Sequence, residues 1–259
     1  MKKKKTYVAL ATIALLTATA SCRQHYEMTS ISRDRILIDK TFDGQPDAQA
    51  TAFITPYRTK VDSIKSPLVG YSACYMAAKA PESNLTNFMT DILIWAGEQY
   101  NEKPDFGVYN IGGMRAAFPE GRITYGDVAD VAPFENKICF VSLTGDKVME
   151  LFQQIVRSGG QGVSHGVELV AAKKGRRLLS AKLNGEDIDP TRTYRVATID
   201  YVAQGNDGLT AFKDGTDLNS PQEERNNIRY VIMDYFRYLD KQGKKAEAKV
   251  EGRIKFKEE

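Results

Sequence analysis

The sequence is poor in histidine, and the few histidines that it has are not arranged as metal ligands. Only His25 and His165 occur in 259 residues, and there is no Asp-x-His, Gly-Asn-His or His-x-His string. A two-metal phosphohydrolase centre needs several such ligands that converge on the metals. No glycine-rich phosphate loop ends in Gly-Lys-Ser/Thr either. These residues alone therefore lack the usual machinery for cutting a phosphate ester, and we interpret His165 as structural.

The chain also lacks a strong charge of one sign. Lys and Arg number 36 against 33 Asp and Glu, which gives a net charge of +3. Such a balance provides no polyanion-binding surface by itself, so long nucleic acid is not an expected partner. Hydrophobic residues make up 42% of the chain, enough for the core of one sizeable domain.

Long apolar runs are missing as well, and the one short run lies at the N-terminus. Residues 1–22 begin with four lysines and contain an apolar run that is too short to span a bilayer permanently. This pattern predicts an export signal. Thr19-Ala20-Ser21-Cys22 resembles a loose lipobox, which would make Cys22 the lipid anchor of an exported bacterial lipoprotein in the periplasm, outer membrane or cell surface. The alternative is an ordinary signal peptide cleaved after Ala20.

Two cysteines remain after the signal, and they allow two interpretations. An exported protein can pair Cys74 with Cys139 in a disulfide. Both could equally be small buried apolar residues.

The rest of the chain predicts a tether followed by one domain. Residues 23–60 predict a tether that runs into a first strand, because TSISRDRILIDKTF alternates and DGQPDAQA then breaks the pattern. Residues 61–259 mix helical and strand patterns without strict alternation or repeat. This predicts an α+β fold with a mixed sheet and flanking helices.

Three segments have the spacing of amphipathic helices, and five have strand character. The helices are expected at 83–100, 144–158 and 220–243, with Ser83, Thr144 and Ser220 as N-caps. The strands are expected at 105–110, 137–143, 178–189, 193–203 and 252–256. Asn184-Gly185 predicts a hairpin turn within the third of these strand segments.

Three loop motifs carry the side chains that suit a small anionic ligand. NIGGMR, residues 110–115, follows an expected strand and ends in an arginine that can contact phosphate or ribose oxygens. PFEN presents Phe134, and DYVAQGNDGL presents Tyr201 and Asp207. Each motif taken alone is also typical of an ordinary turn or of core packing.

Together and in this order, the motifs resemble the C-terminal domain of the 5'-nucleotidases. The resemblance runs through ESNLTNFMTD, NIGGMR, GRITYGDVADVAPFEN, LTGDKVMELF and YRVATIDYVAQGNDG to RNNIRYVIMDYF, over roughly residues 65 to 245. It implies an α/β fold that binds the nucleoside. A separate metallophosphatase domain holds two metals and attacks the phosphate in that family.

The resemblance implies four residues that hold the base and the sugar. Phe134 and Tyr201 match two aromatics that enclose the purine ring, although tyrosine replaces the usual phenylalanine at position 201. Asn136 and Asp207 match polar residues that hydrogen-bond the base or the ribose.

It also implies three polar residues near ribose and phosphate. Asn110 and Arg115 match the amide and the arginine of the family, and Lys79 falls where another arginine is usual. Lysine loses the bidentate geometry of arginine. Two further departures are Ile111 in place of a glycine and Glu135, whose charge would weaken nucleotide binding if it pointed inward.

We therefore expect the nucleotide-binding half of an exported 5'-nucleotidase. A separate metallophosphatase chain would supply the divalent metals, and this chain would need no cofactor of its own. One alternative is a stand-alone nucleotide-binding or nucleoside-binding lipoprotein without catalysis. Another is a surface interaction protein that retains only the fold.

Overall fold

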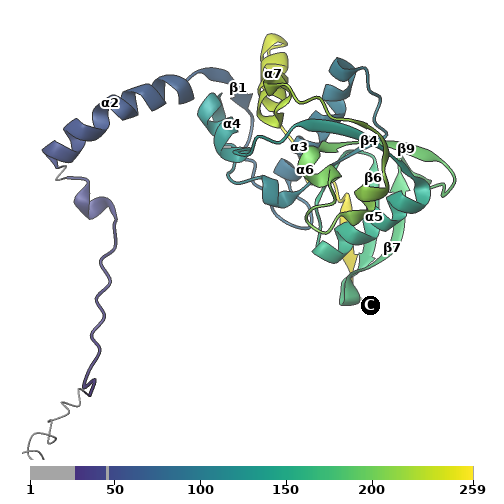
Figure 1. Ribbon diagram of the computed structural model, residues 1–259, viewed down its shortest axis with the longest axis horizontal. Coiled ribbons are helices and arrows are strands. Elements are labelled where there is room, and N and C mark those ends of the chain that lie inside the picture. The colour runs from purple at the N-terminus through teal and green to yellow at the C-terminus, as the bar shows by residue number, and fades with distance from the viewer. Residues whose placement is uncertain (1–26, 45–46, 259) are drawn as a thin grey trace, which may run out of the picture. The chain divides into compact units, whose positions relative to one another are not determined.

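The structure, a computed structural model, describes residues 27–44 and 47–258 (Figure 1). The expected export signal, Cys22 and His25 lie outside these residues. The chain divides into two units, one up to Phe53 and one from Ile54 onward. Among the described residues, no helix combines the length and the apolar composition needed to cross a bilayer.

The strand expected in the tether is wrong. Residues 27–38 form no regular element, and the 3-10 helix η1, Lys40–Phe42, follows them. Alternating residues form a strand only where a neighbouring strand pairs with their backbone groups, and no described strand pairs with this segment. The following segment forms the helix α2, Ala48–Lys65, none of whose residues is buried.

The unit from Ile54 onward contains five further α-helices and eleven strands among its described residues. The helices are α3 (Asn84–Ala96), α4 (Tyr125–Val131), α5 (Gly145–Ser158), α6 (Asp200–Ala203) and α7 (Ile228–Lys241). The strands are β1 (Leu68–Ser72), β2 (Phe106–Tyr109), β3 (Gly121–Thr124), β4 (Ile138–Thr144), β5 (Gly162–Val163), β6 (Val167–Ala172), β7 (Arg177–Leu183), β8 (Glu186–Asp187), β9 (Thr193–Ile199), β10 (Thr216–Asn219) and β11 (Ile254–Lys257). Short 3-10 helices are η2 (Gly97–Tyr100), η3 (Ile111–Gly113), η4 (Lys174–Arg176), η5 (Thr210–Asp214) and η6 (Glu224–Asn226).

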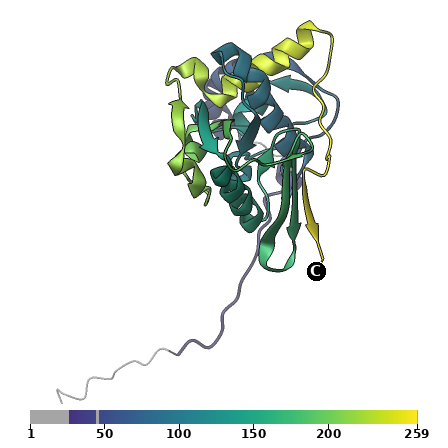
Figure 2. The same ribbon diagram turned by 90° about the vertical axis from the view of Figure 1, so that its right-hand side faces the viewer.

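The strands form three sheets, and the expected mixed α+β architecture is confirmed. The largest sheet has the order β10-β4-β9-β2-β5, in which only β2 and β9 run parallel. The second sheet has the order β11-β6-β7-β8, and Figure 2 shows β11 beside the β6–β7 hairpin. The third sheet pairs β1 with β3. Helix α3 packs on β2 and β5, while α5 packs on β4 and β7.

Helix α3 confirms the sequence pattern in detail. Its inner face buries Leu85, Phe88, Met89, Ile92 and Leu93 in the core. The side chain of Ser83 accepts a hydrogen bond from the backbone N–H of Thr86, whose side chain accepts one from Ser83 in return. This reciprocal cap fixes the start of the helix.

The N-terminal boundary expected for α7 is wrong by seven residues. The helix begins at Ile228 with Asn227 as its N-cap, not after the expected N-cap Ser220, because the backbone before it forms the separate 3-10 helix η6. The backbone N–H of Ile228 donates to the carbonyl of Asn136, at 2.8 Å. This N–H therefore bonds to a neighbouring loop and not to an earlier turn of the helix. Thr144 precedes α5 as expected, but its side chain makes no capping hydrogen bond.

Cys74 and Cys139 are both unpaired, so the disulfide interpretation is not supported. Cys139 is buried in β4, and Cys74 is half-buried. Burial raises the pKa of the Cys139 thiol to about 12, which keeps it protonated and unreactive at neutral pH.

A largely buried ion pair ties three strands of the main sheet together. Glu102 accepts hydrogen bonds from Arg195 Nη2 at 2.6 Å and from Arg195 Nε at 2.8 Å. Arg195 lies in β9 and also donates to Ser142 of β4 and to the carbonyl of Asp217 of β10. The side chains of Glu102 and Arg195 are only 14% and 18% exposed.

We predict that Glu102→Gln lowers the free energy of unfolding by about 3 kcal/mol at pH 7, because it leaves Arg195 unpaired in a poorly hydrated site. The hydrogen bonds from Arg195 hold the pKa of Glu102 below its usual range. The stabilisation that Glu102 gives the wild type is therefore fully present above the unfolded-state pKa of about 4.3. It is lost as the pH falls through the lower pKa that Glu102 has in the folded protein.

Urea unfolding of both proteins between pH 7 and pH 3 measures this difference. Asp234→Asn, at the exposed pair of Asp234 with Arg237, is the control and should cost less than about 1 kcal/mol. Equal stability of Glu102→Gln and wild type at pH 7 would contradict the stabilising role that we assign to this ion pair.

Candidate functional site

Six of the seven residues expected to bind a ligand line one cavity. Its volume is about 340 Å³, and its lining consists of Asn110, Gly112, Gly113, Arg115, Phe134, Asn136, Tyr201 and Asp207. Lys79 is not one of these residues. It is exposed, and its backbone N–H donates to the hydroxyl of Ser83 at the start of α3.

The topology of the main sheet explains why three distant segments meet at this cavity. Strands β2 and β9 are parallel neighbours, so their carboxyl ends lie at the same edge of the sheet. Strand β4 is antiparallel to β9 and begins at that edge, with Ile138 opposite Ile199. The loop after β2, the segment after β9 and the loop before β4 therefore converge at this edge of the sheet.

The glycine-rich loop after β2 is packed closely against its own neighbours. A side chain at Gly113 would come within 2.8 Å of Asn110 Oδ1 and 2.9 Å of Tyr109 Cε1, so only glycine fits there. The backbone N–H of Ile111 donates to Gln161 Oε1 at 2.7 Å. Gln161 is buried and holds this loop in place, a role that the sequence pattern did not indicate.

The loop before β4 presents Phe134, whose side chain is 47% exposed. Arg229 of α7 donates to the carbonyl of Pro133 at 2.9 Å, just before the aromatic residue. On the other side of Phe134, the carbonyl of Asn136 accepts a hydrogen bond from the backbone N–H of Ile228 at the start of α7. Glu135 is exposed and does not line the cavity, so its charge does not point into the site.

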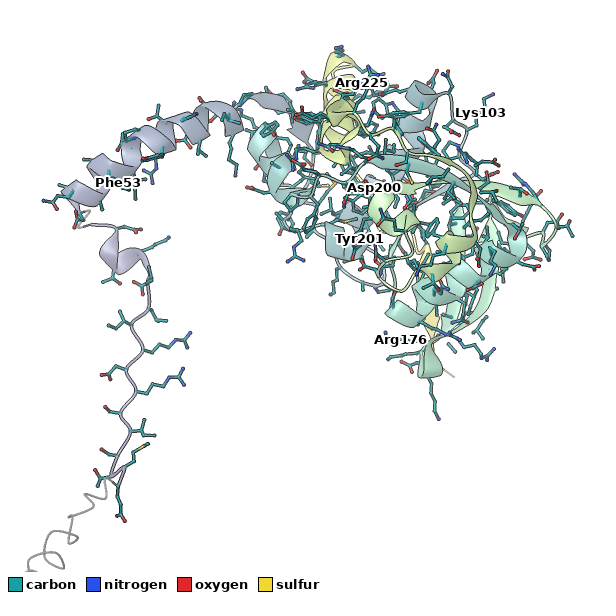
Figure 3. The ribbon with its side chains drawn as sticks, viewed as in Figure 1. Phe53, Lys103, Arg176, Asp200, Tyr201 and Arg225 are labelled. Carbon is teal, nitrogen blue, oxygen red and sulfur yellow. The ribbon has the colours of Figure 1, made fainter. Side chains whose placement is uncertain are left out.

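Tyr201 lies on the short helix α6, because β9 ends at Ile199 and does not extend over the whole strand expected at 193–203. Figure 3 shows it next to Asp200, whose carboxylate accepts a hydrogen bond from the Tyr201 backbone N–H at 2.7 Å. The side chain of Tyr201 is 38% exposed. The two aromatic residues thus share one cavity, and neither is sealed in the core.

Asp207 connects the aromatic wall to the glycine-rich loop. Its Oδ1 accepts a hydrogen bond from the Tyr201 hydroxyl at 3.0 Å, and its Oδ2 accepts one from Asn110 Nδ2 at 2.6 Å. The bond to Asp207 raises the pKa of the Tyr201 hydroxyl, because it favours the protonated form. Asn110 is 3% exposed, and its Oδ1 has no hydrogen-bond partner among the described residues.

Arg115 supplies the positive charge of the cavity. Its backbone N–H donates to the carbonyl of Val131 at 2.9 Å, and its guanidinium makes one long contact, 3.4 Å, with the carbonyl of Gly112. Within the part of the chain that the structure describes, Arg115 forms no ion pair. The cavity therefore combines a cation, a set of acceptor oxygens and two accessible aromatic rings, which suits a flat heterocycle with an anionic substituent.

The described residues form no metal-binding cluster. Within residues 27–44 and 47–258, no group of three or more His, Cys, Asp or Glu side chains is placed to hold a metal ion. His165 lies outside the cavity, with its Nδ1 3.0 Å from a carboxylate oxygen of Glu251.

The sequence of this chain is similar to those of known proteins from one family. Residues 63–214 match the family described as "5'-nucleotidase, C-terminal domain". The chain is 32% identical over 237 residues to the trifunctional nucleotide phosphoesterase protein YfkN of Bacillus subtilis, covering 84% of this chain and 16% of that protein. It is 34% identical over 120 residues to protein UshA of Escherichia coli, covering 45% of this chain and 22% of that protein.

A solved structure shows the same fold. The 5'-nucleotidase precursor from Thermus thermophilus superimposes with a TM-score of 0.70 at 26% identity, over 80% of this chain and 43% of that chain. The chain thus spans less than half the length of each of these relatives.

We predict that Gly113→Ala destabilises the folded protein by about 1 to 3 kcal/mol, because the new methyl group overlaps Asn110 and Tyr109. The adjacent Gly112→Ala is the matched control, since its methyl group would lie 3.5 Å from the nearest atom. Urea unfolding measures both variants. Equal stability of the two variants would contradict the close packing inferred for this loop.

Proposed function

Since the chain belongs to the 5'-nucleotidase C-terminal domain family, we propose that its cavity binds a nucleotide or nucleoside. One observation supports this most directly: six residues predicted from separate motifs line a single cavity. Phe134 and Tyr201 would stack on the base, an interaction that contributes about 1 to 3 kcal/mol per base. Arg115 would contact ribose or phosphate oxygens through charge-assisted hydrogen bonds.

The acceptor oxygens would orient the rest of the ligand. Asp207 offers carboxylate oxygens, which accept hydrogen bonds from ligand hydroxyl or amino groups, and the side-chain N–H of Asn110 holds that carboxylate in place. Because Arg115 is the donor and Asp207 the acceptor, an anionic group and a donor group of the ligand would bind at different places in the cavity. The ligand would therefore bind in one orientation, which is the positioning that a phosphatase needs.

We propose further that a separate, exported metallophosphatase chain provides the metal centre. Divalent metals bound there would activate water for attack on the phosphate, and this chain would hold the substrate. The support is that these 259 residues contain none of the metal-ligand strings described above. A lipid anchor on Cys22 would keep the chain in the cell envelope, where the pair would dephosphorylate extracytoplasmic nucleotides so that nucleosides can be taken up.

We predict that AMP binds the purified chain and that Phe134→Ala and Tyr201→Ala each weaken binding about tenfold or more, because each removes one stacking surface. Isothermal titration calorimetry with adenosine, AMP and ADP measures this. Tyr75→Ala is the control, since Tyr75 is exposed but lies outside the cavity. Binding that is unchanged by Phe134→Ala, or no binding by any of the three compounds, would contradict the proposal.

We predict that the purified chain with added Mn²⁺ or Zn²⁺ releases no phosphate from AMP. Addition of an exported metallophosphatase that carries Asp-x-His and Gly-Asn-His motifs should restore phosphate release, and Phe134→Ala should reduce it. A colorimetric phosphate assay measures each mixture. Release by the chain alone would show that the metal centre is not on a partner, whereas AMP binding without turnover in any mixture would favour a stand-alone binding protein.

A further inference from the structure

The loop that presents Phe134 has no regular structure of its own. Residues 133–136 form no helix or strand, and the side chain of Phe134 is exposed, so packing in the core does not hold the ring. The position of such a ring depends on the backbone that carries it. The contacts that fix this backbone therefore determine whether the ring is in place before a ligand arrives.

The first two residues of α7 supply contacts on both sides of the ring. Arg229 Nη2 donates to the carbonyl of Pro133 at 2.9 Å, and Arg229 Nε donates to the carbonyl of Ala132 at 3.4 Å. After the ring, the backbone N–H of Ile228 donates to the carbonyl of Asn136 at 2.8 Å. The aromatic loop is thus held by two consecutive residues of one helix.

Arg229 acts on the loop from outside the cavity. It is half-buried and is not one of the residues that line the cavity. Both hydrogen bonds that its guanidinium makes with described residues go to carbonyls just before the ring. Pro133 is exposed, so water can replace the arginine at its carbonyl. Loss of the arginine should therefore free the loop at little cost to the stability of the whole protein.

We propose that Arg229 is a positioning residue, which holds Phe134 where it stacks on the base of the ligand. This inference rests on the proposed nucleotide-binding function. A ring that is fixed in advance need not be ordered when the ligand binds, and ordering a side chain lowers affinity. Because Arg229 acts through the ring, it should affect adenosine and AMP equally. A cation that contacted the phosphate directly would affect AMP alone.

Isothermal titration calorimetry of adenosine and AMP with wild type, Arg229→Met and Arg229→Lys tests the inference. We expect Arg229→Met to weaken the binding of both compounds by the same factor, about fivefold. Arg229→Lys should lose less affinity, because an ammonium group can still donate to one carbonyl. Arg237→Met is the matched control and should bind like wild type, since Arg237 lies on the same helix but pairs with Asp234 at 3.0 Å.

Two further measurements separate positioning from general destabilisation. Arg229→Met should cause no further loss of affinity in Phe134→Ala, because no ring is left to position. Amide hydrogen exchange of the ligand-free proteins needs no ligand. In Arg229→Met, residues 134–137 should exchange faster than in wild type, while residues 84–96 of α3 keep the wild-type rate. Hydrogen exchange alone decides if Phe134→Ala binds too weakly to titrate.

The outcomes distinguish failure of this inference from failure of the proposed function. If Arg229→Met weakens AMP binding but not adenosine binding, Arg229 contacts the phosphate; the inference is then wrong and nucleotide binding stands. Wild-type affinity of Arg229→Met, an equal loss with and without the Phe134 ring, or unchanged exchange of residues 134–137 would also overturn the inference alone. If wild type binds neither compound, the proposed function fails and the inference fails with it.

Discussion

The parallel pairing of β2 with β9 is the constraint on which the site depends. Because these two strands run side by side in the same direction, Asn110 and Asp200 emerge at one edge of the sheet. The antiparallel β4 starts at that edge and brings Phe134 to it. The distances along the chain between the three segments are large, so only the sheet can assemble them. A ligand cavity at the carboxyl ends of parallel strands is the common outcome of this geometry.

A second set of side chains, outside the cavity, holds the loops still. Gln161 fixes the glycine-rich loop through the backbone of Ile111, and Arg229 fixes the aromatic loop through the carbonyl of Pro133. These contacts matter for the proposed stacking, because the ring of Phe134 must keep a constant separation from the ring of Tyr201 on α6. A binding site built on loops gains affinity when its loops are ordered before the ligand arrives. The start of α7 and the segment between α5 and β5 thus contribute to the site without lining the cavity.

The sequence predicts much of this arrangement where the signal is local. The spacing of apolar residues located α3 and α5, Asn184-Gly185 located a hairpin, and the ordered motifs identified six residues that meet in one cavity. The sequence contains no comparable local pattern for contacts between distant segments. The helix α7 begins late because Ile228 serves the loop at Asn136, and residues 216–219 are a strand only because β4 lies beside them. Gln161 and Arg229 form hydrogen bonds with backbone groups that are distant in the sequence. The tyrosine at position 201, in place of phenylalanine, did not reveal that its hydroxyl donates a hydrogen bond to Asp207.

We propose that Phe134 and Tyr201 enclose a flat heterocycle, with the Arg115 guanidinium at its edge. A crystal structure of the chain grown with AMP tests this most directly. We expect that the adenine ring lies between the two aromatic side chains and that phosphate or ribose oxygens of AMP lie within hydrogen-bond distance of Arg115. AMP bound elsewhere on the molecule, or bound in this cavity with neither ring against the base, would contradict it.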